Sequence, residues 1–328
     1  MANQEKFKTA IGGQALIEGI MMRGPKKDAI VVRKGEELDI TVTDRKLPPE
    51  KSIKRWPLIR GAVNFFDAQV TGVKALMHSA DLSPEENQEE QMSKFDRWLE
   101  KKMGEAKFQK YLIGAAVALG LGMSIVLFIL LPAFVNNLLS NWLSNDVILF
   151  TAEGVVRILI FLGYMFLCSR LKDMRRVFAY HGAEHKTIRC YEAGLPLTVE
   201  NVRGFSCLHP RCGTSFLFVV VILSILLFSL AVPGLQKLVP ALAAMKGTFL
   251  YKLILILFRL LLLPLIVSIA YEINRFVGRH DNWFTKILTA PGMWLQYLST
   301  NEPEDDMIEV AITALEAVIP QEEGADRW

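Results

Sequence analysis

A long uncharged stretch of the chain, CGTSFLFVVVILSILLFSLAVPGLQ at residues 212–236, decides the class of fold. Apolar stretches of about 18 residues or more predict helices that span a membrane. Three further stretches fit this pattern, so that the predicted spans are 111–131, 147–168, 215–231 and 248–271. The sequence therefore predicts a mainly α-helical integral membrane protein with four spans, and it excludes an entirely soluble one.

Basic residues between the spans predict their orientation. Residues 94–110 contain six Lys or Arg and residues 169–214 contain eight, whereas 132–146 contain none and 232–247 only two. Cytoplasmic loops carry the excess of basic residues. We therefore expect both termini and the 169–214 loop to face the cytoplasm, and membrane lipids to be the partners of the spans.

The segments outside the spans predict smaller cytoplasmic parts. Residues 29–43 contain a β-branched run, a Lys34-Gly35 turn and an alternating run, which predicts a hairpin. Residues 58–78 carry apolar residues at helical spacing and predict an amphipathic helix on the membrane or on the bundle. The predicted domains are a hairpin-and-helix region at 1–80, a linker and juxtamembrane helix at 81–110, a membrane domain at 111–271, and interfacial or cytoplasmic helices with a tail at 272–328.

Two flanking segments carry further signals. The acidic, polar stretch 81–94 predicts a flexible linker. Residues 283–298 are rich in aromatic residues, with two tryptophans, and predict an interfacial segment that is broken at Pro291-Gly292.

The 169–214 loop concentrates residue types that bind metal ions. Residues 181–212 contain three of the five histidines and three of the four cysteines, which are ligands that zinc prefers. If the helix predicted over 147–168 continues past the membrane, His181 and His185 share one helical face with Glu184 beside it. The order H-x-x-E-H is that of inverted zinc peptidases. In such a site zinc lowers the pKa of its water and a carboxylate takes the proton.

A second motif, CLHPRCGTSF at residues 207–216, adds His209 and Cys212 just before the third predicted span. Three interpretations stay open. His181, His185, His209 and Cys212 close a tetrahedral, structural site; or three ligands leave a position for water, with Glu184 as the base; or the histidines cap and pack without a metal. Arg211 either meets lipid phosphates or holds a phosphate or carboxylate of a substrate.

Other function classes receive less support from the sequence. A net charge of +3 and a pI near 8.6 are too mild to predict binding to nucleic acid. The sequence contains no P-loop or dinucleotide fingerprint, so no motif supports a nucleotide-driven mechanism. Glu153, Arg157 and Arg259 within the spans could form a polar path of a transporter, which with four spans per chain would require a homo-oligomer.

Four long motifs in order resemble the YqhQ family, which consists of bacterial multi-spanning membrane proteins described as predicted metal-dependent enzymes. The motifs are GGQALIEGIMMRGP (12–25), YHGAEHKTIRCYEAG (180–194), LTVENVRGFSCLHPRCGTSFL (197–217) and PGMWLQYLSTNEPEDDMIEVAITAL (291–315). The resemblance implies a location in the bacterial plasma (inner) membrane and a polar signature of His181, Glu184, His185, Glu192, His209, Arg211 and Cys212, with Gln14, Glu18 and Arg23 in the first motif.

Together these patterns predict a zinc-type hydrolase with a cytoplasm-facing site. We expect His181 and His185 to bind a divalent metal, His209 or Cys212 to complete the shell, and Glu184 to act as the base. Arg211, Glu192, Glu18 and Arg23 are assigned to substrate binding. The alternative is a non-catalytic membrane scaffold, a regulator, or an oligomeric pore or transporter, in which the metal has a structural role.

Overall fold

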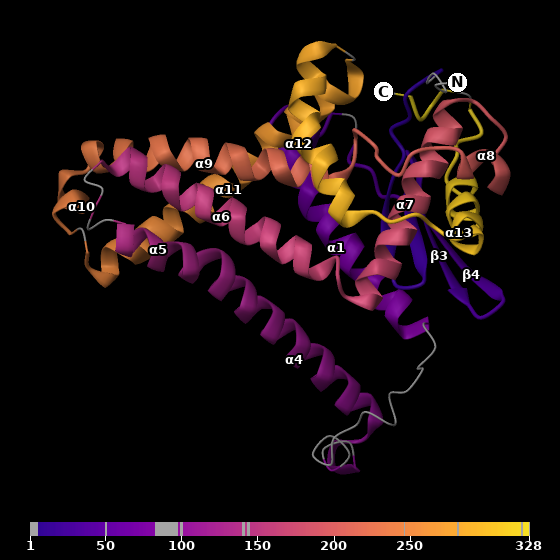
Figure 1. Ribbon diagram of the computed structural model, residues 1–328, viewed down its shortest axis with the longest axis horizontal. Helices are drawn as coiled ribbons and strands as arrows, with labels where there is room; N and C mark the ends of the chain where they lie inside the picture. The colour runs from indigo at the N-terminus through magenta and orange to yellow at the C-terminus, as the bar shows by residue number, and fades with distance from the viewer. Residues whose placement is uncertain are drawn as a thin grey trace. The chain divides into compact units, whose positions relative to one another are not determined.

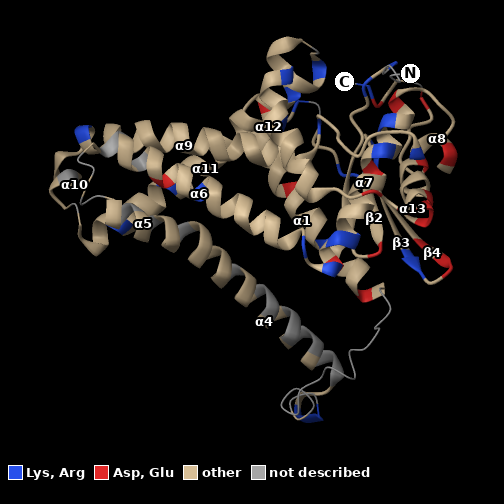
Figure 2. Cartoon of the chain, viewed as in Figure 1, with Lys and Arg blue, Asp and Glu red and all other residues tan. Residues whose placement is uncertain are grey.

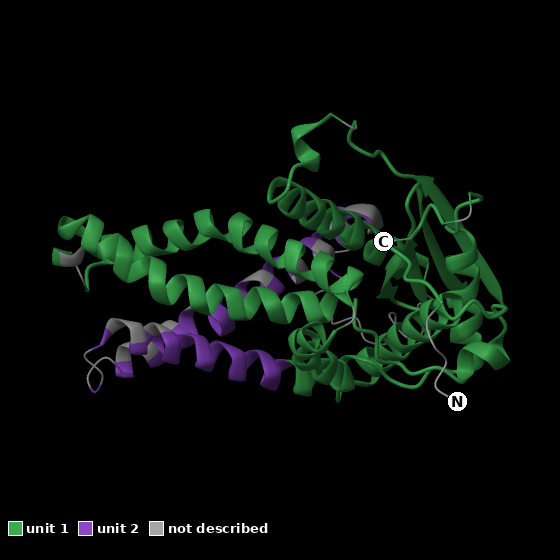
Figure 3. Ribbon diagram, turned by 90° about the horizontal axis from the view of Figure 1, so that it is seen from above, with its two compact units in different colours: residues 1–83, 165–328 green, residues 84–164 purple. Residues whose placement is uncertain are grey.

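The computed structural model describes residues 6–49, 51–82, 98, 101–139, 142, 145–245, 247–280, 282–322 and 324–327. The chain forms two compact units, Met1–Ser83 with Met165–Trp328, and Pro84–Tyr164 (Figure 3). The larger unit contains every residue that was assigned to the site. The predicted linker at 81–94 lies mostly outside the described residues.

A four-stranded antiparallel meander in the order β1-β2-β3-β4 forms the N-terminal part of the larger unit. Its strands are β1 (Gly12–Leu16), β2 (Gly19–Arg23), β3 (Lys27–Lys34) and β4 (Glu37–Asp44). The predicted hairpin at 29–43 is confirmed as β3 and β4, and Gly35 supplies the positive φ of 65° in its turn. The glycine-rich segment 12–25, to which no structure was assigned, forms the other hairpin.

Helices cover the sheet and build the main core. These are α7 (Lys172–Glu192), α8 (Val199–Arg203) and α13 (Asp305–Glu316), seen beside the strands in Figure 1. The core joins apolar side chains of the sheet to those of α7 and α13, among them Ile20, Met22, Val31, Tyr180, Ala183, Ile308 and Leu315. Burial of a large apolar side chain contributes about 1.5–3 kcal/mol, so this core anchors α7 on the sheet.

The two ends of the chain meet on this part of the molecule. Thr9 forms an antiparallel bridge with Arg327, and the Thr9 hydroxyl donates to Oδ2 of Asp326 at 2.5 Å. The described segments next to the two termini therefore lie together, as Figure 1 shows.

The predicted amphipathic helix at 58–78 is confirmed as α1 (Ile59–Leu82). It packs against α11 (Phe249–Arg279), where a Cβ on Gly61 would lie 2.7 Å from the Cα of Ser268. On the side of the sheet, Gly72 leaves room for the Gln14 side chain of β1. Two glycines thus let α1 approach both an apolar helix and the sheet.

Three helices in the described part of the chain are long and apolar enough to cross a membrane. They are Thr151–Cys168 within α6 (Asp146–Cys168), α9 (Gly213–Leu238) and α11. In the larger unit α9 and α11 lie side by side (Figures 1 and 3) and carry few charges (Figure 2). The first predicted span, 111–131, falls on α4 (Glu105–Ile125) and a π-helical turn, η2 (Val126–Leu130), followed by α5 (Leu131–Leu139), and is not among the three.

Two sequence expectations about helix ends are wrong. The second predicted span does not continue into the histidine motif: α6 ends at Cys168, and α7 begins at Lys172 after an extended Leu171. The Ser169 hydroxyl donates to the carbonyl of Phe166 at 2.7 Å and helps to end α6.

The second wrong expectation concerns Pro291, because α12 (Trp283–Ser299) runs through it without a break. A capping box at Asn282 starts this helix. Its middle is held against α9, where a Cβ on Gly292 would lie 2.5 Å from the Cα of Ser215. A short connection, α10 (Pro240–Ala244), follows α9.

Candidate metal centre

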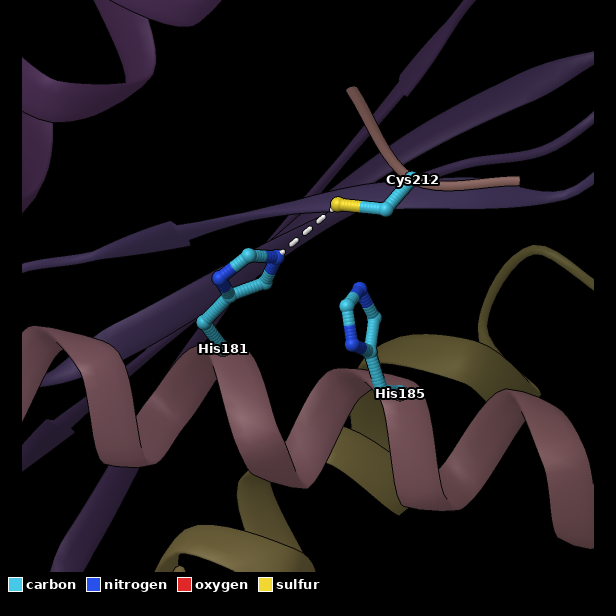
Figure 4. Close-up of side chains that lie close together, drawn as sticks. All are labelled: His181, His185 and Cys212. Atoms are coloured by element: carbon cyan, nitrogen blue, oxygen red, sulfur yellow. Dashed lines mark hydrogen bonds between the residues drawn. The ribbon is translucent and has the colours of Figure 1, made fainter. Parts of the chain in front are cut away.

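Three side chains with metal-binding atoms converge at the start of α9. His181 and His185 stand one turn apart on α7, with ring centroids 4.3 Å apart, and Cys212 is the N-cap of α9. Figure 4 shows both imidazoles rising from one face of α7 toward the Cys212 sulfur. One ligand atom from each residue lies within 4.8 Å of the other two. Zinc bonds nitrogen and sulfur at about 2.0–2.3 Å, so this group can surround one ion.

Backbone carbonyls orient both imidazole rings. Nδ1 of His181 lies 2.7 Å from the carbonyl oxygen of Ser299, and Nδ1 of His185 lies 2.5 Å from that of Cys207. Because a carbonyl only accepts, each Nδ1 carries a proton and donates it. Nε2 of each ring is left facing the group, as in metal sites whose ligand histidines donate to a carbonyl or carboxylate. Nε2 of His185 is buried and has no hydrogen-bond partner among the described residues.

The electrostatics favour a thiolate at Cys212. Burial by itself would raise the pKa of this thiol, but His181 and His185 lower it well below its usual range. Burial opposes charge on His181 too, yet the neighbouring Cys212 raises the pKa of that imidazole to about 9. Without a metal, the proton that the Cys212 thiol gives up therefore sits on His181, whose Nε2 lies 3.2 Å from the sulfur. Metals bind the thiolate and displace such protons.

Glu184 lies next to this group and is held by the sheet. Its Oε1 accepts a hydrogen bond from the Gly13 backbone N–H of β1 at 3.0 Å, while Oε2 makes none within the described part of the chain. The side chain is buried, and burial raises its pKa against the opposing effect of His185 and His181. A Cβ on Gly13 would lie 2.8 Å from Cδ of Glu184, so only glycine leaves room for the carboxyl group.

We expect Glu184→Gln to stabilise the metal-free protein in a pH-dependent way. The folded pKa of Glu184 is raised, so ionising this group costs free energy in the folded chain at pH values above the ordinary Glu pKa of about 4.3. Gln keeps an oxygen for Gly13 and cannot ionise. Thermal unfolding of chelator-treated, full-length protein should give a higher Tm for the variant at pH 8 and equal values near pH 4. A difference that is the same at both pH values would contradict this account.

His209 was grouped with the metal ligands in the sequence; its ring centroid lies 5.5 Å from that of His185, but the residue is outside the described ligand group. Gln296 of α12 holds its backbone, accepting from the N–H and donating to the carbonyl, each at 2.8 Å. Its Nε2 lies 3.4 Å from both Oε2 of Glu192 and Nη2 of Arg211. Burial and then Arg211 lower its pKa well below the usual value. The described ligand group contains three of the four predicted ligands, His181, His185 and Cys212.

Glu192 and Arg211 form a buried ion pair beside His209. The Glu192 carboxylate is inaccessible to solvent and accepts from Nη2 of Arg211 and from the Thr9 backbone N–H, the latter at 2.8 Å. Burial raises the pKa of Glu192, while Arg211 acts in the opposite direction. Glu192 thus orients Arg211 and ties the N-terminal segment to the end of α7.

Glu18 and Arg23, also assigned to substrate binding, both lie in ion pairs of the scaffold. Glu18, with a positive φ of 50° in the β1–β2 turn, binds Arg176 of α7 through both carboxylate oxygens. Arg23 bridges β3 and α1 through Asp28 at 3.2 Å and Asp67 at 2.7 Å. Neither residue belongs to the ligand group.

Several groups that shape the site were not predicted from the sequence. Gly13 and Ser299 contribute a backbone N–H and a backbone carbonyl, which side-chain identity does not reveal. Cys207 likewise contributes its carbonyl, whereas its thiol donates to Oε2 of Glu302 at 3.3 Å. Burial, together with Glu302, raises the pKa of that thiol to about 12, and Cys207 lies outside the described ligand group. The first motif, GGQALIEGIMMRGP, was the only signal that pointed toward Gly13.

These features define a class of mainly helical protein that has both membrane-length apolar helices and a small antiparallel sheet. Residues 56–321 match the family described as a protein of unknown function (DUF1385), so the chain belongs to that family. It is 32% identical over 332 residues to the uncharacterized protein YqhQ of Bacillus subtilis (strain 168), with 97% of this chain and 94% of that protein covered. This confirms the family resemblance seen in the motifs. No solved structure matches the chain.

Proposed function

We propose that the chain spans a bacterial plasma (inner) membrane four times, with both termini and the candidate metal centre on the cytoplasmic side. Three apolar helices of sufficient length support the location. The bridge between Thr9 and Arg327 supports placing both ends on one side. The eight basic residues of 169–214 and the six of 94–110 support the cytoplasm as that side.

We further propose that the chain is a zinc-dependent hydrolase. The observation that carries this proposal is the convergence of His181, His185 and Cys212 within 4.8 Å, with no fourth His, Cys, Asp or Glu in that group among the described residues. Catalytic zinc sites keep three protein ligands and one open position, whereas structural sites are closed by four. Zinc held there would supply a Lewis acid and acidify a water at the open position.

The chain's own residues then divide the work. The Ser299 and Cys207 carbonyls hold the two imidazoles in the orientation that ligation needs. Glu184 is the base that accepts a proton from the attacking water, through Oε2, the oxygen that does not bind Gly13. The pKa of Glu184 is raised toward neutral pH, where a general base is most effective. Arg211, held by Glu192, offers its guanidinium to a phosphate or carboxylate of the substrate.

A non-catalytic scaffold with a structural metal is the second candidate. One observation favours it: the three ligands join α7 to the residue that begins α9, so an ion there would fasten the sheet-bearing part to an apolar helix. The transporter alternative receives less support. Arg157 pairs with Glu153 at 2.5 Å and donates to the Phe128 carbonyl, as a structural ion pair does.

Cobalt substitution tests the metal site and separates the two candidates. Full-length protein reconstituted with Co²⁺ should show a thiolate-to-metal charge-transfer band that is lost in Cys212→Ser and kept in the matched control Cys207→Ser. Acetohydroxamic acid, which binds open metal positions, should then alter the visible spectrum. A spectrum that acetohydroxamic acid leaves unchanged would indicate a closed, structural site. Absence of the charge-transfer band in the wild type would contradict both candidates.

A further inference from the structure

A pocket of about 450 Å³ opens beside the candidate metal centre, in the larger unit. Its walls come from the N-terminal segment, the end of α7, the loop before Cys212, the end of α11, and α12. Four cationic residues line it: Lys8, Arg189, Arg211 and Lys286. The proposed function leaves three of these four cations without a role.

The charge of the pocket has one sign. None of its described lining residues is Asp or Glu. Arg189 donates to the Leu208 carbonyl at 2.9 Å, and no described carboxylate forms a salt bridge with Arg189 or with Lys8. Arg211 is held in place by the buried Glu192. Like charges that share a concave site repel one another and raise the local potential, so the pocket favours an anion.

The pocket also lies where a membrane surface is expected. Val277 and His280, at the end of the membrane-length helix α11, contribute to its lining. Trp294 and Tyr297 of α12 line it too, although 68% and 70% of their surfaces are exposed. Exposed Trp and Tyr at the end of a span are typical of the headgroup region of a bilayer. An apolar chain in the membrane can therefore reach the pocket from the side of α11 and α12.

We propose that this pocket binds the anionic phosphate group of a membrane amphiphile, with the apolar chain lying along α12. Guanidinium groups match phosphate geometry, and lysines add point charges. The pocket volume is within the range of small-molecule sites. That this amphiphile is also the substrate rests on the proposed function. The pocket and the metal centre are adjacent in the chain, because Arg211 lines the pocket and the next residue, Cys212, belongs to the ligand group.

Native mass spectrometry of the full-length protein in a non-ionic detergent tests the binding. The probes are dioleoyl phosphatidate and dioleoylglycerol, which differ only in the phosphate. We expect the wild type to bind phosphatidate at least about tenfold more tightly than dioleoylglycerol. The double variant Lys8→Gln/Lys286→Gln should bind phosphatidate at least about tenfold more weakly than the wild type, because charge-assisted hydrogen bonds to the phosphate are lost. Arg189→Gln, a second variant, should also weaken binding. Lys27→Gln/Lys34→Gln removes the same charge from exposed positions of β3 and should change affinity less than about twofold.

Three outcomes would overturn the proposal. Equal phosphatidate affinity in the pocket variants and the β3 control would show that the pocket charges do not bind the phosphate. Equal affinity of the wild type for dioleoylglycerol and for phosphatidate would show that the phosphate is not recognised. Displacement of phosphatidate by equimolar inorganic phosphate would assign the pocket to a soluble anion. Retained binding by Cys212→Ser would support the pocket even if the metal proposal fails, so the two can be told apart.

Discussion

Replacing Glu184 by Gln should abolish the function of the protein in the cell while leaving its fold and its metal in place. The carboxylate is the only group of the candidate centre assigned to proton transfer, and general-base catalysis contributes about 10²–10⁴-fold to a rate. Gln fills the same space and still accepts from Gly13, so the sheet keeps its contact with α7. The measurement is competitive growth of strains that carry the wild type, the variant or a deletion, under envelope stress.

Glu200→Gln is the matched control for this experiment. Glu200 lies exposed on α8, and its substitution makes the same chemical change outside the site. We expect the control to grow as the wild type and Glu184→Gln to grow as the deletion strain. If the Glu184→Gln strain grows as the wild type does and the variant protein still binds zinc, the enzyme hypothesis is contradicted and the scaffold hypothesis is favoured.

Gly182→Ala should destabilise the sheet and the helices packed on it by about 3 kcal/mol, at the upper end of what overpacking usually costs. A Cβ at this position would overlap the backbone carbonyl oxygen of Asn301. That backbone cannot yield easily, because the Asn301 N–H donates to the Phe178 carbonyl at 2.8 Å and the nearby Ser299 carbonyl holds His181. Thermal unfolding of the full-length protein should show a lower Tm, together with weaker zinc binding.

The control for this glycine is Gly234→Ala on α9. A Cβ there meets nothing within 4 Å, and alanine is favoured over glycine in a helix by about 1 kcal/mol. We therefore expect an unchanged or higher Tm. If Gly182→Ala behaves as Gly234→Ala does, the close approach of residues 299–301 to α7 is not present in solution.

The elements whose signal lies within one short segment of the sequence were predictable. The uncharged run at 212–236 and the β-branched run before Gly35 predict α9 and the β3–β4 hairpin, because the pattern of apolar residues within each segment is sufficient to indicate its local structure. The glycine-rich residues 12–25 gave no such signal. Their pairing as β1 and β2 depends on α7 and α13, which lie far along the chain and supply the apolar face that the strands need.

The candidate site was predictable only in part, and for a similar reason. The spacing of His181 and His185 predicts a shared helical face, and a shared membrane side brought Cys212 near them. The sequence could not separate Cys212 from His209, because the choice depends on Gln296, which holds the His209 backbone from 87 residues away. The position of Glu18 depends equally on a distant contact, with Arg176. Residue type predicts which chemistry is available, and tertiary contacts decide which residues take part.

Metal content tests the central claim most directly. Full-length protein purified in detergent should contain about one zinc per chain by elemental mass spectrometry. The double variant His181→Ala/His185→Ala and the single variant Cys212→Ser should lose it, while His209→Ala should keep it, because His209 lies outside the ligand group. A folded wild-type protein that contains no metal and takes up none when zinc is supplied would contradict the account. Loss of zinc in His209→Ala, with the fold intact, would restore the closed four-ligand site.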